Sequence, residues 1–376
     1  NTIRDCRNTL PLFVYKGNIS MGFYVVEKPV ERDVSREHSY EQVWQELVLD
    51  KTYTAKDKIV IVDADALVYR ISAMCDTRSI LVSRGGKTKE FDTRTKFKEY
   101  CKSKELDYNS FTIEDKIVSE DLSHCLATIK RAIKNIKEGF NATEIVFFLG
   151  GSYNARTDLP LPSQYKSNRS EQIRPKHLKG AREYLAKWYN TYVVTDIEAD
   201  DIVLGVTQHI VNNTSAYCVA WQLDKDFLQN LLPSRYYHPV DDKIYEIKGG
   251  IGELYEHKKG IKGNGLQWLL LQIFLGDSTD NYGSKQFFSR KYGEKSYYKD
   301  FKDISNEKEL LSKWWDKWCE LLPERIVYTD WKGVEQNLSR LEVAEMMFKC
   351  AYMRTSPNDD TTFKSLLDKY EVSVNE

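Results

Sequence analysis

The chain carries closely spaced acidic residues whose pattern suggests a metal site. The densest group is Glu198, Asp200 and Asp201, which follows a strand-like run at 192–194 and begins an apolar, helix-like stretch. On a helix, residues three apart share a face, so Glu198 and Asp201 are expected to lie together. Buried like charges repel, and a divalent cation relieves that repulsion. The alternative is an acidic first turn favoured by the helix dipole.

Acidic residues also follow three other apolar runs. The runs at 58–62 and 215–223 indicate strands, and the run at 266–275 indicates a helix. In α/β sheets, ligands bind at the carboxyl ends of the strands, although Asp63 could equally cap a helix. Oxygen ligands without His or Cys spacing favour two Mg²⁺ or Mn²⁺ ions. The predicted metal ligands are Asp63, Glu198, Asp200, Asp201, Asp224, Asp226, Asp277 and Asp280.

A local basic segment occupies residues 164–187 of a chain whose formal net charge is only −1. Lys166 and Arg169 are three apart, so on a helix they share a face, with Tyr165 beside them. Lys and Arg suit phosphate oxygens, and a Tyr ring can stack on an unpaired base. We predict that Lys166 and Arg169 are catalytic, stabilising charge on the phosphate. The alternative is a solvated basic face. The predicted nucleic-acid-binding residues are Tyr165, Lys166, Arg169, Arg174, Lys176, Lys179 and Arg182.

The elements that position these residues indicate an α/β domain. A strand at 58–63, an amphipathic helix at 124–137 and a strand at 144–149 predict a right-handed βαβ unit. We therefore predict an N-terminal extension at 1–57, a catalytic domain at 58–290 and a C-terminal helical region at 291–376. Within these, residues 43–49 are expected to be helical, and residues 77–122 to be an insertion made largely of loops and surface helix.

The cysteine content and the length of the apolar runs indicate the cellular compartment in which the protein works. The seven cysteines are scattered without a C-x-x-C pair, which argues against a zinc site or a disulfide framework. This pattern fits a cytoplasmic protein. Apolar runs are too short to span a membrane, so no membrane partner is expected.

In their order along the chain, these motifs resemble the 5′-nuclease (flap endonuclease) family, and bacteriophage 5′–3′ exonucleases in particular. The resemblance covers about residues 58–290. It implies a PIN-like α/β fold, with a mostly parallel central sheet flanked by helices and a helical arch at about 160–187. By this resemblance, one metal ion belongs to Asp63, Glu198, Asp200 and Asp201, and the second to Asp224, Asp226, Asp277 and Asp280. Tyr165, Lys166 and Arg169 match the arch.

The function implied is that of a metal-dependent 5′–3′ exonuclease or structure-specific 5′ flap endonuclease acting on DNA in phage replication or degradation. The implied partners are DNA with a 5′ end or flap, RNA primers in RNA–DNA hybrids, and a replicative polymerase. Two features depart from the family pattern: no acid lies near Gly150 until Asp158, and residues 281–285 lack most glycines of a helix–hairpin–helix. A non-catalytic DNA-binding accessory protein and a PIN-type ribonuclease therefore remain alternatives.

Overall fold

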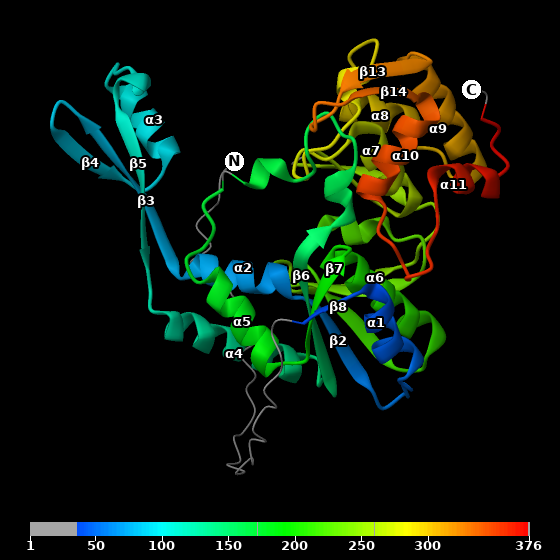
Figure 1. Ribbon diagram of the computed structural model, residues 1–376, viewed down its shortest axis with the longest axis horizontal. Helices are drawn as coiled ribbons and strands as arrows, with labels where there is room; N and C mark the ends of the chain where they lie inside the picture. The colour runs from blue at the N-terminus through cyan, green and yellow to red at the C-terminus, as the bar shows by residue number, and fades with distance from the viewer. Residues whose placement is uncertain (1–35, 171, 259, 375–376) are drawn as a thin grey trace.

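The fold is built on a seven-stranded sheet. The computed structural model describes residues 36–170, 172–258 and 260–374, so residues 1–35 of the predicted extension lie outside it. The strand order is β1-β7-β6-β2-β8-β9-β10, and every neighbouring pair is parallel except β9 and β10. Figure 1 shows helices flanking this sheet. The predicted α/β fold class is confirmed. The strands are β1 (Glu37–His38), β2 (Lys58–Asp63), β6 (Glu144–Asn154), β7 (Thr191–Asp196), β8 (Tyr217–Trp221), β9 (Ser234–His238) and β10 (Lys243–Ile247).

Helices cover both faces of this sheet, which explains why its central strands are continuous apolar runs. Residues 59–62 of β2 are almost completely buried. On one face lie α2 (Ala64–Met74), α4 (Leu122–Gly139) and α5 (Leu178–Trp188). On the other lie α6 (Ala199–Asn213), α1 (Tyr40–Trp44) and a π-helical turn at Gln45–Leu49. The described part of the predicted N-terminal extension is therefore integrated into this domain.

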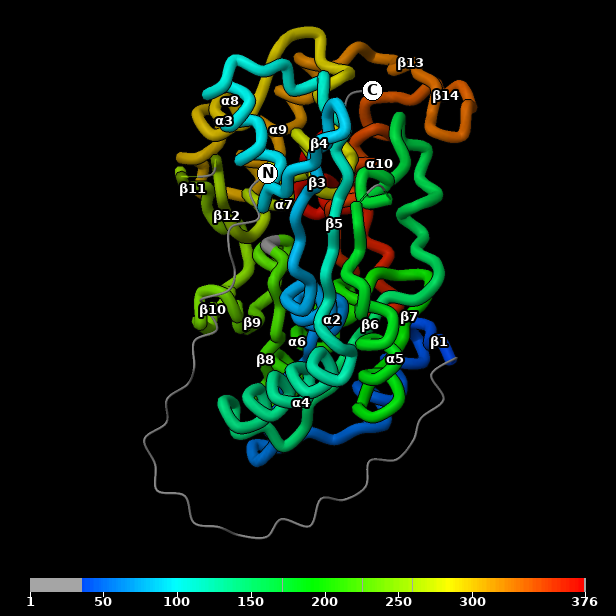
Figure 2. Tube along the Cα trace, turned by 90° about the vertical axis from the view of Figure 1, so that its left-hand side faces the viewer, coloured from blue at the N-terminus to red at the C-terminus, as the bar shows by residue number. Residues whose placement is uncertain are grey.

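Residues 76–119 form a separate small unit, which we call the insertion lobe. Its strands β3 (Asp76–Arg84), β4 (Lys87–Phe91) and β5 (Thr112–Ser119) make an antiparallel sheet, covered on one face by α3 (Arg94–Ser103). Figures 1 and 2 show β3 and β5 carrying the lobe away from the end of α2. The prediction of loops and surface helix was wrong, because strands buried on one face only carry many polar residues.

The C-terminal part is a helical unit around α7 (Gly265–Leu275), which is buried along its whole length. This unit also contains two antiparallel hairpins: β11 (Glu253–His257) with β12 (Gly260–Asn264), and β13 (Arg325–Thr329) with β14 (Glu335–Ser339). One apolar cluster joins α7 to the later helices, so the predicted boundary at 290 falls inside a continuous core. Among the described residues, no helix has the length and apolar character needed to cross a membrane. The later helices are α8 (Glu294–Phe301), α9 (Glu307–Leu321), α10 (Arg340–Ala351) and α11 (Phe363–Lys369).

Candidate active site

Three buried or half-buried carboxylates meet at the carboxyl edge of the sheet. Asp63 ends β2 and caps α2, accepting a hydrogen bond from the backbone N–H of Ala66 at 3.2 Å. Asp200 lies in the first turn of α6, and Asp224 follows β8, the neighbour of β2. We call Asp63, Asp200 and Asp224 the unpaired triad, because within the described residues none of them forms an ion pair.

The unpaired triad is electrostatically strained. Burial, together with the nearby Asp224 carboxylate, raises the pKa of Asp63 to about 7, against the lowering effect of the Ala66 N–H. Burial also raises the pKa of Asp200 well above its usual range, and Asp63 and Asp224 add to this shift. A divalent cation would remove this repulsion, and carboxylate oxygens are suitable ligands for Mg²⁺ or Mn²⁺. The residues therefore fit a divalent ion by charge and donor type.

The described side chains do not form a finished coordination shell. No group of three or more His, Cys, Asp or Glu side chains in residues 36–170, 172–258 and 260–374 is already arranged to hold a metal ion. What the triad provides is oxygen donors without ion-pair partners at one edge of the sheet.

A second group of acids at the same edge is neutralised by cations of the chain itself. Arg156, in the turn after β6, donates from Nη1 to Glu198 Oε2 at 2.9 Å and to Asp201 Oδ2 at 2.7 Å. Its Nη2 donates to Asp201 Oδ1 at 2.8 Å. Both carboxylate oxygens of the fully buried Asp201 are thus engaged, and the backbone N–H of Arg354 donates to Oδ1 as well, at 2.7 Å.

This arrangement corrects the prediction of a shared helix face for Glu198 and Asp201. Glu198 is the N-cap of α6, with φ −77° and ψ 147°, and its conformation is extended rather than helical. The two carboxylates nevertheless come together, because both bind Arg156. Arg156 also donates to the backbone carbonyls of Lys349 (3.1 Å) and Tyr352 (2.7 Å), so it connects this edge of the sheet to α10.

Lys166 links Glu198 to Asp280. Its ammonium forms an ion pair with Glu198 and lies 3.6 Å from Asp280, which also pairs with Arg169. Although burial alone would raise it, the pKa of Glu198 falls to about 2 because Lys166 and Arg156 stabilise the carboxylate. Burial would lower the pKa of Lys166, but Glu198, Asp280 and Asp200 together raise it. Lys166 has φ +57°, an uncommon backbone conformation for a residue other than glycine.

We call these three acids with their cations the compensated group. Its members are Glu198, Asp201 and Asp280, with Arg156, Lys166 and Arg169.

Tyr165 does not have the exposure that stacking requires. Its side chain is only 3% exposed, and its hydroxyl donates to Asp280 at 3.0 Å and Glu198 at 3.2 Å. This corrects the prediction that the ring stacks on a base. Lys166 and Arg169 do not share a helix face either, because residues Ser167–Arg169 form a single 3₁₀ turn. In the described part of 160–187, α5 is the one longer helix. Proline at 160, 162 and 175 disfavours a continuous helix across the segment.

The other two predicted metal ligands lie around the buried Tyr282. Asp226 Oδ1 accepts from Gln272 Nε2 at 2.5 Å, and Asp277 Oδ1 accepts from the N–H of Thr279 at 2.7 Å. Burial raises the pKa of Tyr282 well above its usual range, with Asp226 and Asp277 among the charges that add to the shift. A second ion at these acids stays a prediction.

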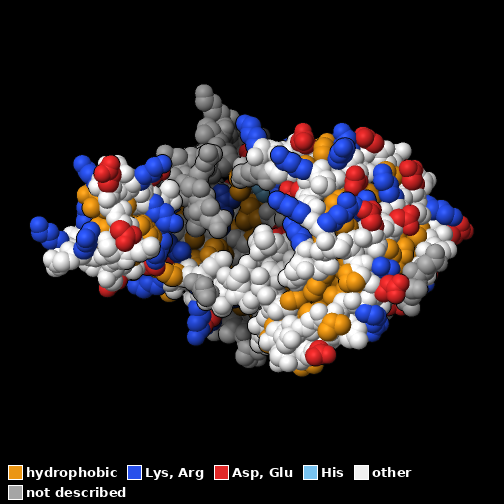
Figure 3. All heavy atoms as spheres, turned by 90° about the horizontal axis from the view of Figure 1, so that it is seen from above, with side chains coloured by type: hydrophobic (Ala, Val, Ile, Leu, Met, Phe, Trp, Pro, Cys, Tyr) orange, Lys and Arg blue, Asp and Glu red, His pale blue; other side chains and the backbone are white. Residues whose placement is uncertain are grey.

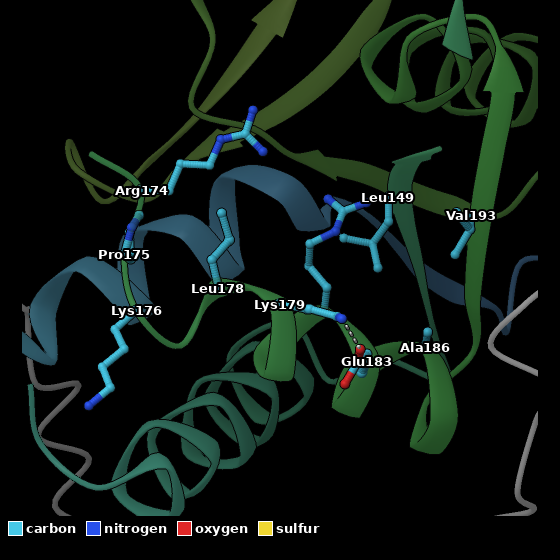
Figure 4. A pocket seen from close by; sticks show the side chains of 10 residues that line it. Leu149, Arg174, Pro175, Lys176, Leu178, Lys179, Glu183, Ala186 and Val193 are labelled. Carbon is cyan, nitrogen blue, oxygen red and sulfur yellow. Dashed lines mark ion pairs between the residues drawn. The ribbon is translucent and has the colours of Figure 1, made fainter. Parts of the chain in front are cut away.

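The predicted basic residues of α5 and the preceding loop line a cavity of about 490 Å³ beside Leu149 and Val193. Figure 4 shows Arg174 and Lys176 pointing apart, and Lys179 paired with Glu183 at 3.9 Å. The cations predicted here to bind nucleic acid are Arg174, Lys176, Lys179 and Arg182.

Arg182 connects this cavity to the unpaired triad. It binds the carbonyl of Gly150 and pairs with Asp65, whose Oδ2 accepts from the N–H of Gly150 at 2.7 Å. Burial lowers the pKa of Arg182, and the Asp63 carboxylate acts in the opposite direction. The positive segment therefore borders the carboxylates.

Sequence reasoning missed Arg156 and Asp65. Arg156 follows β6, where the motif pattern lacks an acid, but a single Arg in a turn carries no periodic signal. Asp158, the first acid after β6, is exposed and binds Tyr153 (2.6 Å) and Lys332 (3.1 Å) instead of joining the site.

No protein-family model matches the chain, and no curated protein matches it. Among solved structures, the chain is similar to the 5′-exonuclease of bacteriophage T5 with bound zinc, with a TM-score of 0.41 and 15% identity over 68% of this chain and 78% of that one. It is also similar to the T5 flap endonuclease in a complex with DNA and metal ions, with a TM-score of 0.42 and 14% identity over 83% and 96% of the two chains. At these values, the function must be inferred from the chain's own residues.

Proposed function

We propose that this protein is a divalent-metal-dependent nuclease that hydrolyses DNA phosphodiester bonds. The observation that carries the proposal is the unpaired triad beside a basic segment: burial and the neighbouring carboxylates raise the pKa values of Asp63 and Asp200. Carboxylates that repel one another in this way favour a bound cation, and cations of the chain nearby favour a polyanionic substrate.

Asp63, Asp200 and Asp224 would hold the ion, which we propose to be Mg²⁺ or Mn²⁺. Once bound, such an ion supplies a water of lowered pKa and stabilises charge on phosphate oxygens. Glu198 and Asp201 serve a different purpose in this proposal: they bind Arg156 and so hold the turn after β6 against α6. A second ion at Asp226 and Asp277 belongs to the proposal as well, whereas Asp280 is already paired with Lys166 and Arg169.

Lys166 is the side chain proposed to act on the substrate phosphate. Its ammonium counteracts the rise that burial causes in the pKa values of Asp63 and Asp200, and it forms ion pairs with Glu198 and Asp280. Lys166 therefore lies close to both groups of acids. A cation held there before the substrate arrives can stabilise charge that develops on the phosphate. Arg169 retains more exposure than Lys166, and we propose that it binds the neighbouring phosphate.

The order of the motifs supports action at a 5′ end or a 5′ flap, in phage DNA replication or degradation. Basic side chains along 174–182 support the approach of a strand towards the triad. Since the pattern of acids and the basic segment match the 5′-nuclease motifs, we favour DNA over RNA as the substrate.

The test is digestion of a 5′-labelled DNA duplex that carries a single-stranded 5′ tail, in Mg²⁺, Mn²⁺ or excess EDTA. We expect short labelled products with either metal and none in EDTA. Lys166→Ala should lower the single-turnover rate at saturating DNA by about 10²–10³-fold, while Lys130→Ala on α4 should leave it unchanged. Cleavage that persists in EDTA would contradict the proposal. DNA binding without cleavage would favour an accessory protein, and faster cleavage of the matching RNA would favour a ribonuclease.

A further inference from the structure

The insertion lobe has its own apolar core and attaches to the main domain by a narrow stem. Ile80, Val82, Phe97 and Cys101 are buried within it. At the stem, Arg78 donates to the carbonyl of Ile173 at 3.0 Å, and the backbone N–H of residue 176 donates to Asp76 at 3.2 Å. The lobe is therefore joined directly to the basic segment that borders the unpaired triad.

The outer end of the lobe carries a cationic patch. Residues 84–89 contain Arg84, Lys87 and Lys89 without an acid, and all three side chains are exposed. Within the described part of the chain none of the three forms an ion pair, whereas Arg94, Lys96 and Lys116 elsewhere on the lobe do. We call Arg84, Lys87 and Lys89 the tip patch. Figure 3 shows Lys and Arg side chains over the lobe, at the left of the view.

The three side chains point to one face of the lobe sheet. Arg84 is opposite Lys87, and Val82 is opposite Lys89, so the cations continue the row that begins with the buried Ile80 and Val82. Aromatic rings hold two of them: Arg84 Cζ lies 5.2 Å from the ring centre of Phe111, and Lys89 Nζ lies 4.3 Å from that of Tyr100. The positive charge is thus concentrated and oriented rather than scattered.

We propose that the tip patch binds the phosphate backbone of the single-stranded 5′ arm of the DNA substrate. This inference rests on the proposed function, because it takes DNA as the ligand of the site. A strand that crosses the basic segment next passes the stem, and β3 leads from the stem to the tip. The nine residues of β3 span about 30 Å, which is the length of about nine stacked nucleotides.

The experiment measures binding rather than cleavage. In EDTA, fluorescence anisotropy gives the Kd for a duplex with a 5′ single-stranded tail of about 3 or about 15 nucleotides, and for a blunt duplex. The tip variant combines Arg84→Ala, Lys87→Ala and Lys89→Ala. The control variant removes three exposed cations of α4 by Lys130→Ala, Arg131→Ala and Lys137→Ala.

We expect the tip variant to bind the long tail about tenfold more weakly and to lower the salt slope by about two units, since a single strand contributes about 0.7 per phosphate contact. The short tail and the control variant should show no such loss. An unchanged Kd for the long tail, an equal loss at both tail lengths, or a loss seen mainly with the blunt duplex would overturn the assignment. A protein that cleaves DNA without this tail-length dependence refutes only the lobe proposal. Lobe-dependent binding without cleavage refutes only the nuclease proposal.

Discussion

The unpaired triad and the compensated group lie at the same edge of the same sheet, yet their charges are balanced in opposite ways. Glu198, Asp201 and Asp280 are all paired with Arg156, Lys166 or Arg169. Asp63 and Asp200 have no such partner among the described residues, and burial raises their pKa values, whereas the pKa of Glu198, despite its burial, falls because of its two cationic partners. A metal ion adds little stabilisation to a carboxylate that already has a cationic partner in the chain, whereas it strongly stabilises a carboxylate without one.

This difference shows that acids spaced alike along a chain can serve different purposes. Asp200 and Asp201 are neighbours in sequence, but successive helical residues point about 100° apart. Asp200 consequently faces Asp63 and Asp224, while Asp201 faces Arg156. We therefore expect substitutions in the two groups to affect different properties of the protein.

The largest expected effect comes from removing the central cation of the compensated group. Arg156→Gln leaves Glu198 and Asp201 buried without their partner, which should lower the free energy of unfolding by about 3–5 kcal/mol. Urea denaturation measures this loss. The control is Arg290→Gln, which breaks an exposed pair with Glu320 and should cost only a small fraction of that loss. Equal losses in the two variants would show that the Arg156 pairs contribute no more than a surface contact.

The next effect separates the two groups by metal affinity. Asp200→Asn should weaken Mn²⁺ binding by more than about 100-fold, because even partners outside the metal's own ligand shell account for 10–100-fold. Asp201→Asn should bind Mn²⁺ within a few-fold of the unmodified protein. Isothermal titration calorimetry gives both values, with Asp158→Asn as a control for an exposed acid of the same neighbourhood. If Asp201→Asn loses as much affinity as Asp200→Asn, the division between the groups is wrong.

The smallest expected effect is that, in the absence of metal, Asp200→Asn and Asp201→Asn change the stability of the protein in opposite directions. Without divalent cations, Asp200→Asn removes a carboxyl group whose ionised form is disfavoured by burial and by Asp63 and Asp224, so it should stabilise the protein at neutral pH by about 1 kcal/mol. Asp201→Asn removes a partner of Arg156 and should destabilise it. Thermal unfolding in EDTA measures both shifts. A lower melting temperature for Asp200→Asn would indicate that its repulsion with Asp63 and Asp224 is already relieved by other means.

The central elements were predictable because their signals are local. Each of these elements can be recognised from its own residues alone: β2, β6 and β8 from continuous apolar runs, and α4 from an apolar stripe. Parallel strands place their carboxyl ends at one edge, so the gathering of acids there was expected from sequence order, although Asp224 was assigned to the second ion rather than to the ion of Asp63 and Asp200. The insertion lobe was not recognised as a sheet, because strands with one open face offer few apolar residues per strand.

The sequence by itself therefore determined the parallel sheet and the edge at which the acids gather. Only the tertiary structure decided which acids are neutralised: Arg156 reaches Glu198 and Asp201, 42 and 45 residues away, and the carbonyl of Tyr352, 196 residues away. Tertiary packing likewise buried Tyr165 against Glu198 and Asp280. Periodicity is a property of one element, whereas ion pairing depends on which separate segments come into contact, and their spacing along the chain does not encode that contact.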